Sequence, residues 1–443
     1  MWHKSRRGQA ARGEPDGVGV KYRSRFGHSQ GGTTSMSSRR LPILVLCGLL
    51  LTAAAAKAGI LDGNCRVADQ PAATLLIPYF EVDLADMSGQ TTLFSVNNAS
   101  VKPALARVVL WTDWAVPTLA FDVYLTGYDV QTFNVRDLLQ GKLPATGPET
   151  NHPGELSDPN IAFPGCGGVN TASIAVAPDV SQRTWLQAAH TGRPVAKSAA
   201  QCAGSGAAGP NIATGYITVD AVNRCSPLSV GTTANTPAQA SYFAKGGKGL
   251  ASDANVLWGD YQYMNPRKNV GDSQSAVAVV ADPDRFTAGD YTFYGRYVNF
   301  DGRDDRAPLS SLYYARYMNG GTFSGGTDVV VWRDNRKSTA SLATCGKAPS
   351  WVPLGEMQLV IFDEEENPAA IVGGNSFPVT AQKVHVGSSA LSVPKSMGFL
   401  MIDLWHKDST HAQGWVSVIM SAKGRFSAGH EAVRVDDLCN FGL

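Results

Sequence analysis

The stretch from residue 75 to residue 139 alternates between apolar and polar side chains with a period of two. In its clearest part, Phe121, Val123 and Leu125 fall on one side of the chain and Asp122 on the other. Successive side chains of a strand point to opposite faces of a sheet, so this pattern predicts a half-buried strand. The turns between neighbouring strand-like segments are too short for crossover helices, which indicates antiparallel pairing.

Short strand-like segments recur through the rest of the chain at intervals of about ten residues. Two helical turns are predicted, at 136–140 before Gly141 and at 181–190 with Ser181 as a cap, whereas Leu309–Met318 fits either a strand or a helix. The strand-like segments outside the first stretch are 215–222, 255–263, 274–281, 328–332, 357–362, 398–405 and 414–420.

This spacing predicts an all-β protein with two β-sandwich regions of the immunoglobulin-like type. The first sandwich region is expected at 59–145 and the second at 350–443. Between them the sequence predicts a loop-rich insertion with one short helix at 146–210, rich in Gly, Pro and Ser, and a strand-rich middle region at 211–349. A chain of 443 residues exceeds the usual size of a single core, which agrees with several regions.

The sequence of residues 1–58 predicts a disordered basic lead followed by a signal peptide. Arg39 and Arg40 precede the apolar run LPILVLCGLLLTAAAA, and small residues follow as far as Ala58. This predicts export to the periplasm or beyond, with cleavage before Gly59 and no membrane span afterwards. A retained membrane anchor at 41–56 is the alternative, but this run is shorter than the about 20 apolar residues that a spanning helix needs. Translation from Met36 and a twin-arginine export route remain alternatives.

Charge argues against a nucleic-acid partner. Residues 1–58 hold ten of the 38 Lys and Arg residues and two of the 37 Asp and Glu residues, which leaves 28 basic and 35 acidic residues and a net charge of −7. The remaining sequence has no basic cluster of the kind that neutralises phosphates.

Cysteine usage favours an oxidising compartment. One of the seven cysteines, Cys47, lies in the apolar run of the leader. The others are scattered without CxxC spacing, which predicts up to three disulfides rather than a zinc site. We expect Cys166 to pair with Cys202, since both lie in Gly-rich sequence, and free thiols are the alternative. The six are Cys65, Cys166, Cys202, Cys225, Cys345 and Cys439.

Two acidic clusters are candidates for a hard cation such as calcium. Asp301, Asp304 and Asp305 follow Asn299, and the segment Asp363–Asn367 has four acidic residues in a row. Neither cluster matches the EF-hand loop, and solvated hairpin tips explain the same residue types. Calcium at Asp301, Asp304 and Asp305 is the one cofactor hypothesis; no organic cofactor is expected.

No catalytic motif stands out. The sequence has neither GxSxG nor HExxH, and its histidines after residue 58 show no metal-binding spacing. No catalytic or cofactor-binding residue is therefore assigned. Paired carboxylates of a glycosidase remain an alternative, but sequence gives no separation between them.

Aromatic residues are abundant in the strand-like segments, including Trp111, Trp114, Trp258, Tyr261 and Tyr263. On an exposed sheet face such residues stack on sugar rings or form a protein interface. The alternative is that they pack in the core, because aromatics are favoured in strands.

Several phrases together resemble a group of predicted secreted proteins of Gram-negative bacteria without an established activity. They include LLIPYFEVDL, TTLFSVNNAS, FDVYLTGYDVQTFNVRDLL, NVLWGDYQY and QLVIFDEEENP. The resemblance covers most of 74–439 and implies export and an all-β fold. We therefore expect an exported, non-catalytic binding or structural protein with an unknown protein or glycan partner at the cell surface, with a polysaccharide hydrolase as the alternative.

Overall fold

A computed structural model describes residues 70–143, 163–166, 177–196, 200–232, 236–335, 337, 341–372, 374–405 and 412–435. The predicted leader and two of the predicted disulfide cysteines, Cys65 and Cys439, lie outside these residues. Every strand ladder in the described part of the chain is antiparallel, so the predicted all-β, antiparallel fold is confirmed.

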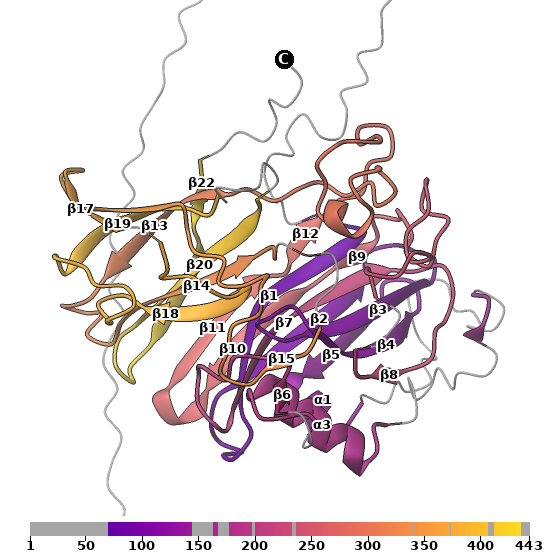
Figure 1. Ribbon diagram of the computed structural model, residues 1–443, viewed down its shortest axis with the longest axis horizontal. Helices are drawn as coiled ribbons and strands as arrows, with labels where there is room; N and C mark the ends of the chain where they lie inside the picture. The colour runs from indigo at the N-terminus through magenta and orange to yellow at the C-terminus, as the bar shows by residue number, and fades with distance from the viewer. Residues whose placement is uncertain are drawn as a thin grey trace, which may run out of the picture. The chain divides into compact units, whose positions relative to one another are not determined.

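The first half of the fold consists of two sheets that pack on each other through β1, β2 and β10 (Figure 1). The six-stranded sheet has the order β12 (Val277–Val279), β1 (Thr74–Asp83), β7 (Ile212–Ala221), β3 (Ala104–Trp111), β4 (Pro117–Leu125) and β8 (Ser229–Val230). The other sheet has the order β11 (Val270–Ser275), β10 (Asp260–Asn265), β2 (Thr91–Asn98) and β5 (Val130–Asn134), with β9 (Leu257–Trp258) also paired to β2.

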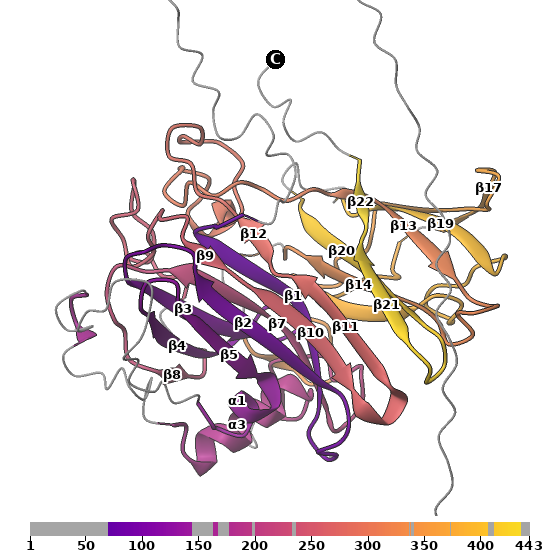
Figure 2. The ribbon, with the colours of Figure 1, turned by 180° about the vertical axis from the view of Figure 1, so that it is seen from behind.

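The second half also consists of two sheets. One has the order β17 (Pro368–Val372), β16 (Gln358–Phe362), β19 (Met397–Asp403), β13 (Leu312–Met318) and β22 (Val433–Arg434). The other has four strands in the order β18 (Ala381–His385), β14 (Gly326–Arg333), β20 (Gly414–Ser421) and β21 (Ser427–Glu431). Its edge strand β21 lies beside β11 of the first half (Figure 2). A small ladder joins β6 (Gln201–Cys202) to β15 (Ala343–Thr344).

The two central strands of the four-stranded sheet, β14 and β20, are buried on both faces. Val329 and Val331 of β14 belong to the hydrophobic core shared with the β13–β19 sheet. Val330 and Trp332, which point the other way, belong to the core of the first half. This explains the unbroken apolar run in β14, because a strand between two cores has no solvent-facing side. The sheet is therefore a layer common to two cores.

Strand β4 is also buried on both faces, which differs from the prediction. All nine residues of this strand are buried, including Asp122, so the prediction of a half-buried strand is wrong. Phe121 packs toward the smaller sheet, with its ring centroid 5.9 Å from that of Phe133. Asp122 is covered on the opposite face by segments that follow much later in the chain.

Both predicted helices are present and lie together near one end of the first two sheets (Figure 1). They are α1 (Val135–Leu139) and α3 (Val180–His190). The cap of α3 is Asp179 rather than the predicted Ser181, and Asp179 forms a reciprocal capping box with Gln182. The described residues include the 3₁₀ turns η2 (Pro266–Lys268) and η3 (Gly295–Tyr297). None of the described helices has the length and hydropathy that a membrane crossing requires.

The predicted middle region, 211–349, supplies strands to both halves. Its strands β7 and β12 pair with β1 in the six-stranded sheet, whereas β13 and β14 pair with strands from the end of the chain. The ambiguous segment Leu309–Met318 contains a strand, β13.

Candidate ligand-binding groove

One face of the β2 sheet points away from the six-stranded sheet and carries three cross-strand rows of side chains. The alternate residues of β2 point inward. One of them, Phe94, stacks on Phe133 with ring centroids 4.6 Å apart. The outward residues line up across the strands because the ladder registers place them opposite one another. The rows are Asn134, Leu93 and Gln262; Thr132, Ser95 and Asp260; and Val130, Asn97 and Trp258.

These nine residues form the floor of an open groove with a volume of about 650 Å³. Helix α1 and the residues after it make one wall, through Asp137, Leu138, Lys142 and Leu143. The volume lies within the range of small-ligand sites, about 300 to 1,000 Å³. The groove therefore has room for a ligand of a few sugar or amino-acid residues.

Phe94 and Phe133 also border this groove but are buried, whereas Trp258 is an aromatic residue of the groove that is 37% exposed. Its neighbours on the sheet, Tyr261 and Tyr263, are buried in the core instead. The interpretation that aromatic residues pack in the core is therefore confirmed for Tyr261 and Tyr263. Trp258, in contrast, is partly exposed and can contact a ligand. An exposed indole is a large flat surface that loses little conformational entropy on binding.

Three polar side chains of the floor are linked to one another by hydrogen bonds. Ser95 Oγ donates a hydrogen bond to Asp260 Oδ1 over 2.6 Å, and Asn97 Nδ2 lies 3.3 Å from Ser95 Oγ. Groups fixed before binding lose less freedom when a ligand arrives.

The α1 wall is anchored just as firmly. Asn134 caps the helix by accepting a hydrogen bond from the N–H of Arg136, and it also accepts one from Thr91 Oγ1. On the surface of the wall, Lys142 Nζ lies 3.4 Å from Asp137 Oδ1. The guanidinium of Arg136 donates to the main-chain carbonyls of Asp83, Met87, Gly89 and Gln90.

The residues predicted to bind calcium are not brought together. Asp301 is exposed and pairs with Arg303 over 2.8 Å. Asp304 is fully buried and accepts hydrogen bonds from Thr292 Oγ1 and from the N–H of Tyr294. Across the described ranges, no three His, Cys, Asp or Glu side chains form a group able to hold a metal ion. Asp304 and Asp305 are buried, so a solvated hairpin tip does not describe them either.

Asp305 faces a carboxyl group that is distant in sequence, that of Asp253. Burial raises the pKa of Asp253 to about 7 in spite of the nearby Arg306 charge, and Asp305 adds to the shift. Burial raises the pKa of Asp305 as well. Sequence spacing gives no sign of this pair, because 52 positions separate the two residues.

The second acidic cluster is a solvated turn, as its residue types also suggested. Asp363 accepts hydrogen bonds from the main-chain N–H groups of Glu365 and Asn367, which closes the turn between β16 and β17. Glu365 and Glu366 are exposed.

Two described histidines, His190 and His385, contact other residues of the fold, and His430 is exposed on β21. His190 is buried, with Nδ1 2.9 Å from the Thr214 carbonyl oxygen and Nε2 2.7 Å from Thr118 Oγ1. His385 Nδ1 lies 2.8 Å from Asp328 Oδ1 at the surface. His152, His406 and His411 lie outside the described residues.

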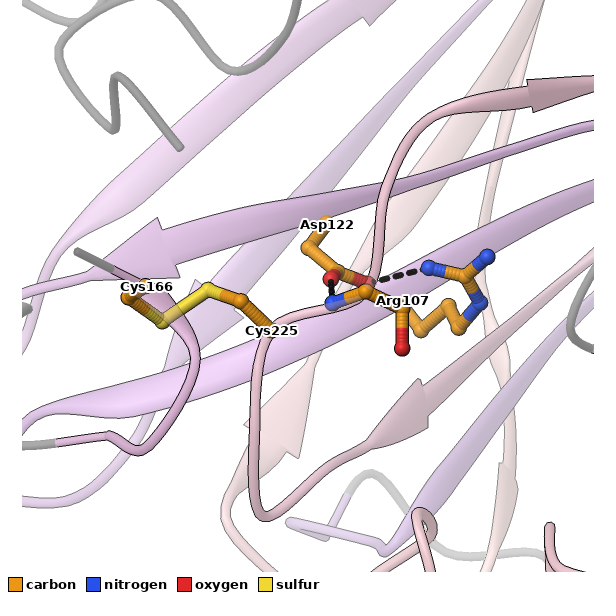
Figure 3. The surroundings of a disulfide bond; sticks show 5 residues. Arg107, Asp122, Cys166 and Cys225 are labelled. Atoms are coloured by element: carbon orange, nitrogen blue, oxygen red, sulfur yellow. Dashed lines mark hydrogen bonds and ion pairs between the residues drawn. A yellow bond between two sulfur atoms is a disulfide. The ribbon is translucent and has the colours of Figure 1, made fainter. Parts of the chain in front are cut away.

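Between the cysteines that the structure describes, two disulfides are formed, and neither is the predicted pair. Cys166 bonds to Cys225 and Cys202 bonds to Cys345, so the predicted bond between Cys166 and Cys202 is wrong. The Cys225 loop lies against the buried face of β4. Figure 3 shows Asp122 between Arg107 and this loop. Arg107 Nη1 is 2.7 Å from Asp122 Oδ1, and the N–H of Ser226 donates to Asp122 Oδ2 over 2.5 Å.

The groove was found only in part from the sequence. Alternation on β2 and the exposed-aromatic hypothesis for Trp258 were available signals, but no local pattern connects 93–97 with 130–134 and 258–262. The chain matches no protein-family model, no curated protein and no solved structure.

Proposed function

We propose that this protein is an exported, non-catalytic binding protein whose groove takes a short stretch of glycan at the cell surface. The observation that carries the proposal is the partly exposed Trp258 side chain beside a floor of hydroxyl, amide and carboxylate groups. A sugar ring has an apolar face that stacks on an indole and hydroxyls that exchange hydrogen bonds with such groups. The two disulfides support an oxidising compartment.

The two sheet pairs, which we interpret as sandwiches of the immunoglobulin-like type, serve as rigid supports for this face. Sheet faces and loops of such folds present binding surfaces to many ligands, so the proposal rests on the groove and not on the fold.

Two tryptophans of equal exposure allow a matched test. Trp258 lines the groove, whereas Trp405, also 37% exposed, follows β19 in the other half of the fold. We expect the full chain to bind at least one of chitin, β-glucan or lipopolysaccharide oligosaccharides in isothermal titration calorimetry. W258A should weaken that binding about tenfold or more, and W405A should leave it unchanged. Binding that W258A leaves intact, or binding of protein partners with no glycan bound, would contradict the proposal.

A polysaccharide hydrolase remains the second candidate, because two carboxylates, Asp137 and Asp260, line the same groove. A glycosidase needs one carboxyl group on each side of the scissile bond. Release of reducing ends from the bound oligosaccharide, abolished by D137N and by D260N, would favour the hydrolase. Binding without any release of reducing ends would favour the binding protein.

A further inference from the structure

One carboxylate on the floor of the groove has no cation beside it. Asp260 lies in the middle row of the floor, with Thr132 and Ser95. The two other charged residues that line the groove balance each other on the α1 wall, where Lys142 Nζ lies 3.4 Å from Asp137 Oδ1. In the described part of the chain, no Lys, Arg or His side chain forms an ion pair with Asp260. The negative charge of the floor is therefore left for a ligand to balance.

The hydrogen bonds of the floor leave acceptors rather than donors around this carboxylate. Ser95 Oγ donates its proton to Asp260 Oδ1, and Asn97 Nδ2 donates in turn to Ser95 Oγ. Asp260 Oδ2 has no hydrogen-bond partner among the described residues and is not fully buried, and Asn97 Oδ1 also lacks a donor there. An ammonium group complements such acceptors, because it has three donors and no acceptor.

Trp258 lies close enough to Asp260 for one ligand group to contact both. Trp258 pairs opposite Asn97 and Gln262 pairs opposite Leu93, so the chain from 258 to 262 keeps one register against β2. Trp258 and Asp260 are therefore alternate residues on one face, about 6.6 Å apart along the strand. A cation is attracted to the face of an indole when it lies within about 6 Å of the ring centroid. The same cation can thus accept the charge of the carboxylate and the attraction of the ring.

We propose that the groove selects a glycan with free amino groups, such as an oligomer of glucosamine, over the N-acetylated form of the same glycan. This inference rests on the proposed glycan-binding function and adds the chemistry of the ligand. A pyranose ring stacked on Trp258 carries its 2-amino group at the ring edge, where Asp260 accepts a hydrogen bond from it. Acetylation removes the positive charge and two of the three N–H donors. Residues after 58 have a net charge of −7, which favours the approach of a cationic oligomer.

The first test uses the full wild-type chain and compares glucosamine and N-acetylglucosamine oligomers of equal length by isothermal titration calorimetry. At about pH 6 the amino groups are charged, and the glucosamine oligomer should bind about tenfold or more tightly than the N-acetylated one. A sugar amine resembles an α-amino group, whose pKa is about 8, so it is neutral at higher pH. At about pH 9.5 the difference in affinity should therefore fall below about threefold.

The second test removes the charge of Asp260 and keeps the shape of its side chain. The amide oxygen of D260N can still accept the hydrogen bond from the Ser95 hydroxyl. D260N should bind the glucosamine oligomer about tenfold or more weakly than the wild type and the N-acetylated oligomer within about twofold of it. D301N is the control, because Asp301 is exposed and paired with Arg303, and it should leave both affinities unchanged.

Two results would overturn the amine preference: N-acetylated oligomers that bind the wild type at least as tightly at about pH 6, or a preference that D260N retains in full. Either result leaves the proposed glycan groove standing if W258A weakens the binding. If neither oligomer binds the wild type, the amine preference is also overturned. Binding of β-glucan or lipopolysaccharide oligosaccharides then decides the proposed function separately.

Discussion

Lys383 Nζ lies 2.7 Å from Glu81 Oε2 and thereby joins β18 of the four-stranded sheet to β1 of the six-stranded sheet. Tyr79 donates a second hydrogen bond to the same carboxylate oxygen. Burial disfavours the charge on Glu81, but Lys383 and Tyr79 together lower its pKa below the usual value. Burial likewise disfavours the charge on Lys383, but Glu81 and the nearby Asp328 together outweigh burial and raise the pKa of Lys383. The pair is thus an ionic contact between the two halves of the fold.

Removing the amine of Lys383 should cost more stability than the loss of a surface ion pair. K383M leaves the Glu81 carboxylate half-buried without its cation, and we expect a loss of about 2 to 3 kcal/mol in urea unfolding at pH 7. K142M, which breaks the exposed pair with Asp137, is the control and should change stability by less than about 0.5 kcal/mol. Adding E81Q to K383M should recover part of the loss. Equal stabilities of K383M and K142M would contradict a buried contact.

This contribution has a defined pH window. The pKa of Glu81 is lowered in the folded state, so its stabilisation is present above about pH 4.5 and is lost as the pH falls further. The pKa of Lys383 is raised, so its stabilisation is present below about pH 10.5 and is lost above the raised pKa. The difference in unfolding free energy between wild type and K383M should therefore be largest between pH 4.5 and pH 10.5.

The burial of β14 on both faces can be tested by substitution. Val330 and Val331 point to opposite faces, and both are fully buried. V330T and V331T should each lose about 1 to 3 kcal/mol, because each places a hydroxyl in an apolar core. V130T, at a position that is 58% exposed on β5, should change stability by less than about 0.5 kcal/mol. Tolerance of threonine at either β14 position would show that its face is open to solvent.

Much of the fold follows from local pattern, and the errors have a common physical cause. Alternation is a property of neighbouring residues, so β4, β14 and both helices could be predicted from short windows of sequence. What covers the second face of a strand is decided by segments far away in the chain. Asp122 was therefore expected to face solvent, whereas the loop that carries Ser226 covers it. The pattern shows which residues share a face but not what lies opposite that face.

The candidate site was less predictable for the same reason. Trp258 could be recognised as a possible ligand contact, but its row with Val130 and Asn97 depends on ladder register. Asp305 was selected as a carboxylate for calcium, yet its neighbour Asp253 is contributed by a separate loop. Composition identifies the residue types suited to a chemistry, and tertiary pairing decides which of them meet.

His190 should make the protein sensitive to acid. Burial lowers its pKa from the ordinary 6.5 to about 4, so below pH 6.5 the unfolded state takes up a proton that the folded state refuses. Stability is fully present above pH 6.5 and should fall by about 3 kcal/mol as the pH approaches 4. H190Q, which does not titrate, should show a shallower decline in urea unfolding over this range. An unchanged slope in H190Q would contradict the assignment.

Asp113 should make the protein less stable as the pH rises, which is opposite to the effect of His190. Burial raises its pKa from 3.8 to about 6, although Ser205 donates hydrogen bonds to the carboxylate through its N–H and hydroxyl. The folded state therefore holds the proton more tightly, and the stability this gives is complete below pH 3.8 and lost as the pH rises through 6. D113N should remove this pH-dependent change in unfolding free energy, which is about 3 kcal/mol between pH 3.8 and pH 6. Its unfolding free energy should exceed that of the wild type by more at pH 7 than at pH 4, and a constant difference would contradict this sign.

The disulfide pattern gives the most direct check of the chain's tertiary arrangement. Non-reducing digestion should yield linked peptides for Cys166 with Cys225 and for Cys202 with Cys345. These bonds span sequence separations of 59 and 143 residues. By lowering the entropy of the unfolded chain, they should stabilise the fold by about 4 and about 5 kcal/mol, respectively. C166S/C225S should lose the additional support of the Ser226 N–H at Asp122, because that loop is no longer fixed beside β4. A linked peptide joining Cys166 to Cys202 would contradict both bonds, and with them the positions of the Cys225 loop beside β4 and of β6 beside β15.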